Sequence, residues 1–160
     1  MKIRKDPLVS RRNLLLLSGI PAAGKSHFGR YLAREYGFAH YDLECHPGGW
    51  PHPELKVIWD ASRSAFLTEL QNRHERIVLD WGFPPSAIEI VEEIRIGGAT
   101  VVWFDGSIAQ ARKKFVERGG IDVSKFDAQV KAIQQADLPL KLTCVIVNVL
   151  SRGGGFSRGE

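Results

Sequence analysis

The sequence has few cysteines and no long hydrophobic run, and each shortage excludes a class of protein. Its two cysteines, Cys45 and Cys144, lie far apart, so their spacing fits neither a disulfide framework nor a paired zinc knuckle. The longest apolar stretches have the length of a strand and are too short to span a bilayer. The charged residues 1–12 lack the apolar run of a secretory signal. We therefore expect a soluble cytoplasmic protein with no membrane segment.

Charge of one sign is not concentrated in any block of the sequence. The net charge of +4 and the pI near 9.2 favour an anionic ligand, and a nucleotide would satisfy that bias. The 160 residues contain 44% hydrophobic side chains and no internal repeat, which predicts one domain over residues 1–150. Residues 151–160 are rich in glycine and predict a flexible tail. Its single RGG-like stretch makes a nucleic-acid partner possible but does not favour one.

Strand and helix patterns alternate along the chain, which is typical of an α/β fold with a parallel sheet. The expected strands cover residues 13–18, 38–42, 76–81, 99–105 and 142–150. The expected helices cover residues 25–36, 53–72, 85–96, 107–118 and 124–136. The first strand is a continuous apolar run from Leu14 to Leu17, as expected of a central strand that is buried on both faces.

A complete phosphate-binding motif follows this first strand. Gly19, Gly24, Lys25 and Ser26 match the pattern G-x-x-x-x-G-K-[ST], and the motif leads into an amphipathic helix. Glycines let the backbone N–H groups turn toward phosphates, and the helix N-terminus adds partial positive charge. Lys25 would reach the β- and γ-phosphate oxygens, and the Ser26 hydroxyl would join the shell of Mg²⁺. The sequence therefore predicts a P-loop that binds Mg-ATP.

These residues, together with Asp42 at the end of the second strand and the segment 79–84 (Leu-Asp-Trp-Gly-Phe-Pro), carry a family resemblance. The sequence resembles small P-loop kinases related to adenylate, shikimate and gluconate kinases over about residues 13–150. The likeness is nearest to the zeta-toxin-type and chloramphenicol phosphotransferase-type enzymes. It implies a three-layer P-loop NTPase fold, with helices on both faces of a five-stranded parallel sheet of order 2-3-1-4-5. The nucleotide is then expected at the carboxyl ends of the strands.

The resemblance also implies roles for acidic side chains at strand ends. Similar kinases place a substrate-binding or base carboxylate at the position of Asp42, and Glu44 is the alternative for that role. Asp80 follows a buried strand and would face the Mg²⁺ water shell, so the predicted metal residues are Ser26 and Asp80. Pro85 stands where adenylate kinases carry an arginine for the acceptor nucleotide, which argues against a nucleoside monophosphate as acceptor.

Cations must neutralise the transferred phosphoryl group, and a lid around residues 118–124 is expected to supply one. Arg118 lies where related kinases carry a lid arginine, and Arg112 is a second choice because a spacing of six residues does not put both on one helical face. The predicted catalytic residues are Lys25, Asp42 and Arg118. The predicted nucleotide contacts are Gly19, Ala22, Ala23, Gly24, Lys25, Ser26, His27, Arg112 and Arg118.

Two further clusters have open or rejected interpretations. The aromatic side chains Trp50, Trp81 and Phe83 would form either a wall of the acceptor site or part of the core. Histidines and Cys45 within residues 40–53 suggest zinc, but their spacing matches no usual ligand pattern.

The predicted function is a kinase that moves the γ-phosphate of Mg-ATP to a hydroxyl of a small-molecule acceptor. One alternative is a nucleotide-binding switch with slow hydrolysis, although the guanine-selective Asn-Lys-x-Asp motif is missing. The other is a polynucleotide 5'-hydroxyl kinase, which the acidic residues around the P-loop make less favourable. The sequence indicates neither the acceptor nor the oligomeric state.

Overall fold

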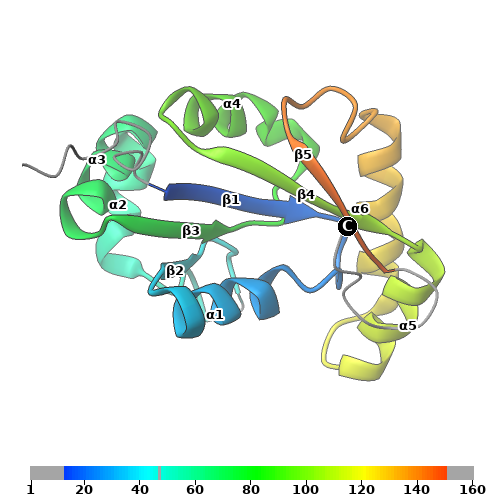
Figure 1. The fold of residues 1–160 in the computed structure, drawn as a ribbon. Coiled ribbons are helices and arrows are strands. Elements are labelled where there is room, and N and C mark those ends of the chain that lie inside the picture. Colours follow the sequence, from blue (N-terminus) through cyan, green and yellow to red (C-terminus); the bar gives the residue numbers. More distant parts are fainter. Residues whose placement is uncertain (1–12, 47, 151–160) are drawn as a thin grey trace, which may run out of the picture.

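A five-stranded sheet forms the centre of the protein, with all neighbouring strands parallel and in the order β2-β3-β1-β4-β5. The computed structural model describes residues 13–46 and 48–150. The strands are β1 (Asn13–Gly19), β2 (Ala39–Asp42), β3 (Arg76–Asp80), β4 (Thr100–Gly106) and β5 (Val145–Leu150). The helices are α1 (Lys25–Tyr36), α2 (Pro53–Ala61), α3 (Arg63–Arg73), the short 3-10 helix η1 (Pro85–Ala87), α4 (Ile88–Ile96), α5 (Ile108–Arg118) and α6 (Val123–Gln135). Helices pack around this sheet (Figure 1), so the predicted P-loop NTPase fold and strand order are confirmed.

The first strand is central because its leucine run has no polar face. Leu16 and Leu17 are completely buried, and β1 pairs with β3 on one side and with β4 on the other. A strand covered on both faces is expected to be apolar throughout, because it has no side that meets water. The core therefore forms around β1, and the loop that follows β1 starts from a fixed position.

The parallel strands bring several loops to one end of the sheet. The loop of residues 19–26 leaves β1 there, and Asp42 and Asp80 end the neighbouring strands β2 and β3. The helices α5 and α6 stand beside this end, where the arrows of β1 and β4 point (Figure 1). Open α/β sheets bind ligands at the carboxyl ends of their strands. The fold therefore gathers the predicted site residues at the expected edge.

The single long helix predicted over residues 53–72 is wrong, because the chain breaks it at Ser62. This residue has an extended backbone, with φ −164° and ψ 119°. Its N–H group closes α2 by donating to the Ile58 carbonyl oxygen, and its hydroxyl accepts from the Ala65 N–H group at the start of α3. Serine is a preferred residue at a helix N-cap, because its hydroxyl satisfies an otherwise unpaired backbone donor. Apolar periodicity continues across the break and hides it.

The other elements lie where they were predicted, with shifted ends. The last strand differs most, since β5 begins at Val145 and the segment before it forms a turn closed by the bond from the Leu142 N–H group to the Pro139 carbonyl oxygen. The helix predicted from residue 85 begins as the 3-10 turn η1 and continues as α4. Helix α1 has its predicted bounds and is closed by Gly37, which adopts the left-handed conformation with φ 69°.

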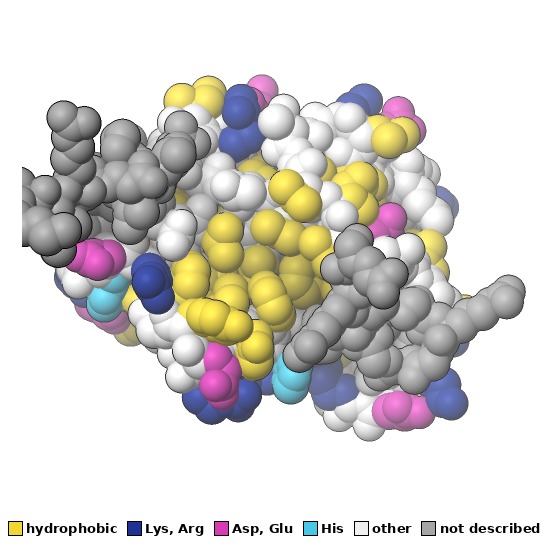
Figure 2. Space-filling view, in the orientation of Figure 1, with side chains coloured by type: hydrophobic (Ala, Val, Ile, Leu, Met, Phe, Trp, Pro, Cys, Tyr) yellow, Lys and Arg dark blue, Asp and Glu magenta, His cyan; other side chains and the backbone are white. Residues whose placement is uncertain are grey.

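Hydrophobic side chains gather over the middle of the sheet on the face seen in Figure 2. By register, Leu15, Val102, Val145 and Val147 point to one face of β1, β4 and β5. Helix α1 packs on this side of the sheet against β1, β2 and β3. Val145 and Val147 are exposed, whereas Val101 and Trp103 on the opposite face of β4 are buried. The edge strand β5 is exposed on both faces, because Ile146 on its other face is also exposed, whereas β4 is buried on both faces at Trp103 and Phe104.

Three further expectations from the sequence concern the cysteines, membrane-spanning helices and the C-terminal tail. Both Cys45 and Cys144 are free thiols. No helix within residues 13–46 and 48–150 is long and apolar enough to cross a bilayer. The predicted tail of residues 151–160 lies outside the described residues, as do residues 1–12 of the predicted domain.

Candidate functional site

The loop between β1 and α1 has the backbone conformation that a phosphate cradle needs. Gly19 and Gly24 have φ values of 136° and 90°, and Ala22 has a positive φ of 57°. Gly24 is the N-cap of α1, where no side chain caps the helix. The first N–H groups of a helix have no partner within it, so they remain able to bind an anion. The predicted P-loop residues thus form a site that is suited to phosphate.

Lys25 is a buried cation beside this loop. Its side chain is only 7% exposed, and its Nζ donates a hydrogen bond to the Ile20 carbonyl oxygen over 3.0 Å. Burial lowers the pKa of the Lys25 ammonium below its ordinary value. The carboxylates of Glu44 and Asp80 act in the opposite direction, and the positive charge of Arg118 adds to the lowering. An anion in the loop would therefore meet a desolvated ammonium, for which charge interactions are strong.

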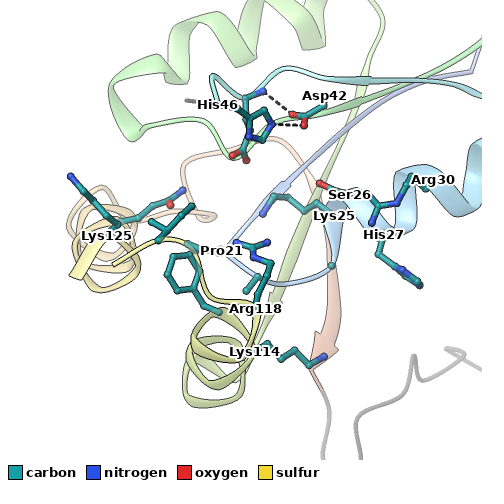
Figure 3. Close-up of a pocket in the computed structure, with 16 residues that line it drawn as sticks. Pro21, Lys25, Ser26, His27, Arg30, Asp42, His46, Lys114, Arg118 and Lys125 are labelled. Atoms are coloured by element: carbon teal, nitrogen blue, oxygen red, sulfur yellow. Dashed lines mark hydrogen bonds and ion pairs between the residues drawn. The ribbon is translucent and has the colours of Figure 1, made fainter. Parts of the chain in front are cut away.

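A cavity of about 560 Å³ lies between the P-loop, the end of β2 and the helices α5 and α6. Figure 3 shows Lys25 and Arg118 pointing into the space that the Asp42–His46 pair faces from the other side. The titratable side chains that line the cavity are Lys25, His27, Arg30, Asp42, Glu44, His46, Lys114, Arg118 and Lys125. Cations are the majority, so the cavity suits an anionic ligand, while the two carboxylates lie on its β2 side.

The two acidic residues after β2 have different environments. Glu44 is tied to the backbone, because its Oε1 accepts a hydrogen bond from the Gly82 N–H group over 2.9 Å. Asp42 accepts the Glu44 N–H group at Oδ1 over 2.9 Å, and its Oδ2 lies 2.7 Å from Nε2 of His46. Both residues line the cavity. Glu44 thus fixes the loop after β3, while Asp42 forms a side-chain pair at the cavity wall.

Asp80 is buried at the end of β3 with one oxygen unpaired. Its Oδ2 lies 3.3 Å from Nε2 of His40, while its Oδ1 is buried without a hydrogen-bond partner among the described residues. A buried acceptor without a partner is costly, and a magnesium-bound water is the kind of donor that would satisfy it. The Asp80 carboxylate interacts electrostatically with the Lys25 ammonium. Ser26 and Lys25 both line the cavity. The predicted metal residues therefore fit Mg²⁺ chemistry.

Sequence reasoning missed His40 as the partner of Asp80. Helix α1 approaches this histidine at Gly29, where an added Cβ would lie 2.5 Å from the His40 Nε2 atom. The glycine thus lets the helix that carries the P-loop lysine pack directly over the histidine. Strand alternation places His40 and Asp42 on one face of β2, and the predicted strand order places β2 beside β3, but neither indicates that the His40 ring turns toward Asp80.

The two predicted arginines lie in different places. Arg118 lines the cavity, and its guanidinium carbon lies 5.4 Å from the centroid of the Phe115 ring. Arg112 instead forms a two-bond ion pair with Asp127 of α6, at 2.9 Å and 3.1 Å. It lies outside the set of residues that line the cavity. The structure therefore brings Arg118, but not Arg112, to the P-loop.

The aromatic residues considered for an acceptor wall lie away from the cavity. Trp50 and Trp81 both pack against Trp59, with ring centroids 5.7 Å and 5.5 Å apart, and Phe83 follows Trp81 at 5.7 Å. None of the three predicted residues lines the cavity. Their contacts support the core interpretation. Across residues 13–46 and 48–150, no group of three or more His, Cys, Asp or Glu side chains is arranged to hold a metal ion.

The cavity also contains residues that sequence reasoning did not select. The polar ones are Arg30 on α1, His46 after β2, Lys114 on α5, and Lys125 and Gln129 on α6. The sequence could have indicated Arg30, because it follows Ser26 by one helical turn and therefore lies on the same face of α1. No sequence pattern indicates the cavity residues of α6, since their position depends on how α5 and α6 pack against each other.

A P-loop between a buried strand and a helix, in a parallel sheet of order 2-3-1-4-5, defines the P-loop nucleotide-binding fold. The sequence matches no family model and no curated protein. Among solved structures, a gluconokinase from Sinorhizobium meliloti 1021 superposes with a TM-score of 0.57 at 20% identity, covering 89% of this chain and 85% of that one. A shikimate kinase from Bacteroides thetaiotaomicron gives 0.58 at 15% identity, covering 86% of each chain.

A third structure, a shikimate kinase from Acinetobacter baumannii in complex with shikimate, has a TM-score of 0.55 and 17% identity over 92% of this chain and 88% of that one. The fold is therefore that of the small P-loop kinases of the gluconate and shikimate kinase type, as the resemblance predicted. The nearer likeness to zeta-toxin-type enzymes stays a prediction.

Proposed function

We propose that this protein is a Mg-ATP-dependent phosphotransferase that moves the γ-phosphate of ATP to a hydroxyl group of a small molecule. The observation that carries the proposal is that one cavity joins Lys25 of the P-loop to the carboxylate of Asp42. A phosphate donor at Lys25 and an acceptor hydroxyl at Asp42 would thus share one cavity. In-line transfer requires this arrangement, because the acceptor oxygen must approach the γ-phosphorus opposite the leaving group.

The donor side would be held by the P-loop and by the lid region. Backbone N–H groups of Ala22, Ala23, Gly24 and Ser26 would cradle the phosphates, with His27 nearby in the first turn of α1. Lys25 would bind the β- and γ-phosphate oxygens from one side, and Arg118 would approach from α5. Two cations aimed at the same group would neutralise charge on the transferred phosphoryl oxygens. The desolvation of Lys25 strengthens this effect.

The residues that would hold Mg²⁺ are Ser26 and Asp80. When bound, the ion would neutralise phosphate charge and help to orient the donor. The buried Oδ1 of Asp80 supports this assignment, because no described group satisfies it. His40 holds the other oxygen of Asp80 at 3.3 Å and so limits the orientations that the carboxylate can adopt.

The acceptor is expected to be a small polar molecule that carries a hydroxyl group. Proteins with the same fold include kinases named for gluconate and shikimate, and one of them is in complex with shikimate. A cavity of about 560 Å³ leaves room for a ligand of this size class next to a triphosphate. Cavity-lining cations that the P-loop does not account for, such as Lys125, would suit an acceptor that is itself anionic.

The proposal is tested by ATP consumption with and without an acceptor panel. The panel contains sugars, sugar acids, nucleosides, aminoglycoside-like and phenicol-like alcohols, and 5'-hydroxyl oligonucleotides. Turnover that depends on a small hydroxyl compound supports the proposal. Turnover that is independent of every acceptor favours a nucleotide switch, and turnover that requires oligonucleotides favours a polynucleotide kinase.

Replacing Asp42 with asparagine is expected to lower kcat for transfer by about 10²-fold while nucleotide affinity stays nearly unchanged. The amide keeps the size of the side chain but removes its negative charge. Binding of a fluorescent ATP analogue and steady-state transfer measure the two effects separately. Asp60→Asn is the matched control, because that carboxylate is exposed on α2 and lies outside the cavity. Full activity of Asp42→Asn would remove Asp42 from the mechanism.

Arg118→Ala is expected to lower kcat/KM for ATP by about 10- to 100-fold, because one of two cations on the transferred group is lost. Arg112→Ala is expected to change it little, because Arg112 is paired with Asp127 on the surface and exposed pairs contribute little. Kinetics of the two variants at saturating acceptor give the comparison. A larger loss for Arg112→Ala would mean that Arg112 leaves Asp127 and reaches the nucleotide.

A further inference from the structure

His46 lines the cavity beside the proposed acceptor position and forms a pair with Asp42. Its Nε2 lies 2.7 Å from Oδ2 of Asp42, and Figure 3 shows the two side chains together at one wall of the cavity. The other ring nitrogen, Nδ1, has no hydrogen-bond partner within residues 13–46 and 48–150. Each oxygen of Asp42 already accepts one hydrogen bond, Oδ1 from the Glu44 N–H group and Oδ2 from His46. In this pair, Nδ1 of His46 is a basic nitrogen that is unpaired among the described residues, on a ring that Asp42 holds in place.

We propose that His46, oriented by Asp42, is the group that takes the proton from the acceptor hydroxyl. This inference rests on the proposed function and assigns an atom to one of its steps. In the neutral ring, Nε2–H donates to the Asp42 carboxylate, and Nδ1 carries the free lone pair. Asp42 is then a positioning residue that fixes the tautomer and stabilises the imidazolium that forms. A histidine held in this way by a carboxylate is a well-known form of general base.

The step is balanced without any further reactant. The hydroxyl proton moves to Nδ1 of His46, and an electron pair of the acceptor oxygen forms the new bond to the γ-phosphorus. The bond between the γ-phosphorus and the bridging oxygen breaks, and its electron pair leaves with ADP. Lys25 and Arg118 lie on the phosphate side of the cavity, so the proton and the transferred group are handled by different residues.

The charges around His46 support this role. The hydrogen bond to Asp42 raises the pKa of the His46 ring above its ordinary value, although partial burial acts against the rise. The carboxylates of Asp42, Glu44 and Asp80 add to the increase through their charge. The cations that line the same cavity are Lys25, Arg30, Lys114, Arg118 and Lys125, and the His27 ring lines it as well. A base whose pKa lies near the working pH is the most effective one, and histidine is the side chain whose ordinary pKa is nearest to neutral pH.

The sign of the pH dependence follows from this pKa direction. Below the raised pKa, His46 carries a proton on both nitrogens and cannot accept another, so transfer is slow. Transfer then rises as the pH passes upward through that pKa. The profile of kcat against pH should therefore have an acid limb with a midpoint above the ordinary histidine value of about 6.5.

The closing experiment compares the pH profiles of the parent protein and His46→Gln. We expect kcat to fall by about 10²-fold in the variant, with an unchanged KM for ATP, and the acid limb to disappear. His52→Gln is the matched control, because His52 packs against Tyr41 and lies outside the cavity. Parent-like rates with an unchanged acid limb in His46→Gln would overturn the role of His46 while leaving the kinase proposal intact. No transfer by the parent protein to any acceptor would overturn both.

A second measurement needs no acceptor. The ring protons of His46, followed by NMR during a pH titration, should report a pKa above the ordinary value in the parent protein and a lower one in Asp42→Asn. The same titration with bound Mg²⁺ and a non-hydrolysable ATP analogue tests the pair in the occupied cavity. An ordinary pKa that does not respond to Asp42→Asn would overturn the proposed pair.

Discussion

Replacing Lys25 with alanine is expected to lower phosphoryl transfer from ATP by about 10³-fold, close to the limit of detection for a slow kinase. The ammonium is the only cationic side chain within the P-loop motif itself, and it lies buried beside the loop. Its removal takes a desolvated charge from a position where charge develops during transfer. We expect magnesium-dependent nucleotide affinity to weaken as well, because the same ammonium would contact the bound phosphates.

Steady-state transfer and calorimetric titration with Mg-ATP analogue measure these two losses. Lys131→Ala is the matched control, since Lys131 is an exposed lysine on α6 that does not line the cavity. Thermal unfolding of both variants separates loss of function from loss of folding. A folded Lys25→Ala protein with parent-like transfer would mean that the P-loop does not bind the phosphoryl donor.

Much of the fold is predictable because its signals are local. The run from Leu14 to Leu17 is long enough to mark a buried strand, and the complete motif after it specifies a loop followed by a helix. Gly37 ends that helix in the left-handed conformation, for which glycine is the usual residue. With these elements recognised, the family resemblance supplies the strand order, which pattern alone does not determine.

The parts that the sequence did not predict depend on contacts between distant segments. Ser62 is a polar residue within an apolar periodicity, and only the position of α3 decides that it begins a new helix. The pairing of His40 with Asp80 depends on β2 lying next to β3, and on Gly29 allowing α1 to come close. The type of a residue and its local pattern do not indicate which distant residue it will contact.

The same reasoning explains why the two arginines of α5 were hard to separate. Their spacing indicates that they point in different directions, but not which direction meets the P-loop. Packing of α5 against α6 decides this, because Asp127 on α6 holds Arg112. His46 was missed as a partner of Asp42 for a related reason, since it lies on a loop without a periodic pattern. Loops without periodicity commonly carry functional residues on a rigid scaffold.

Replacing Gly19 with alanine is expected to destabilise the protein by more than about 4 kcal/mol, or to prevent folding. Gly19 has φ 136°, which residues with a Cβ rarely adopt. An added Cβ would lie 2.2 Å from the carbonyl oxygen of Phe104 and 2.7 Å from its nitrogen, and both atoms belong to the backbone. Side-chain rotation cannot relieve this contact, so β1 or β4 would have to move. Urea unfolding followed by circular dichroism measures the effect.

Gly37→Ala is the control that separates the two causes of this loss. Gly37 also has a positive φ, of 69°, but an added Cβ there would meet no atom within 4 Å. Only the strain of placing alanine in a left-handed backbone conformation remains, so we expect the free energy of unfolding to fall by about 1–2 kcal/mol. The difference between the two variants then measures the close approach of the P-loop to β4, where the Ile20 N–H group also donates to the Phe104 carbonyl oxygen. Equal losses in the two variants would mean that the P-loop is not held against β4, and that its geometry depends on the glycine backbone alone.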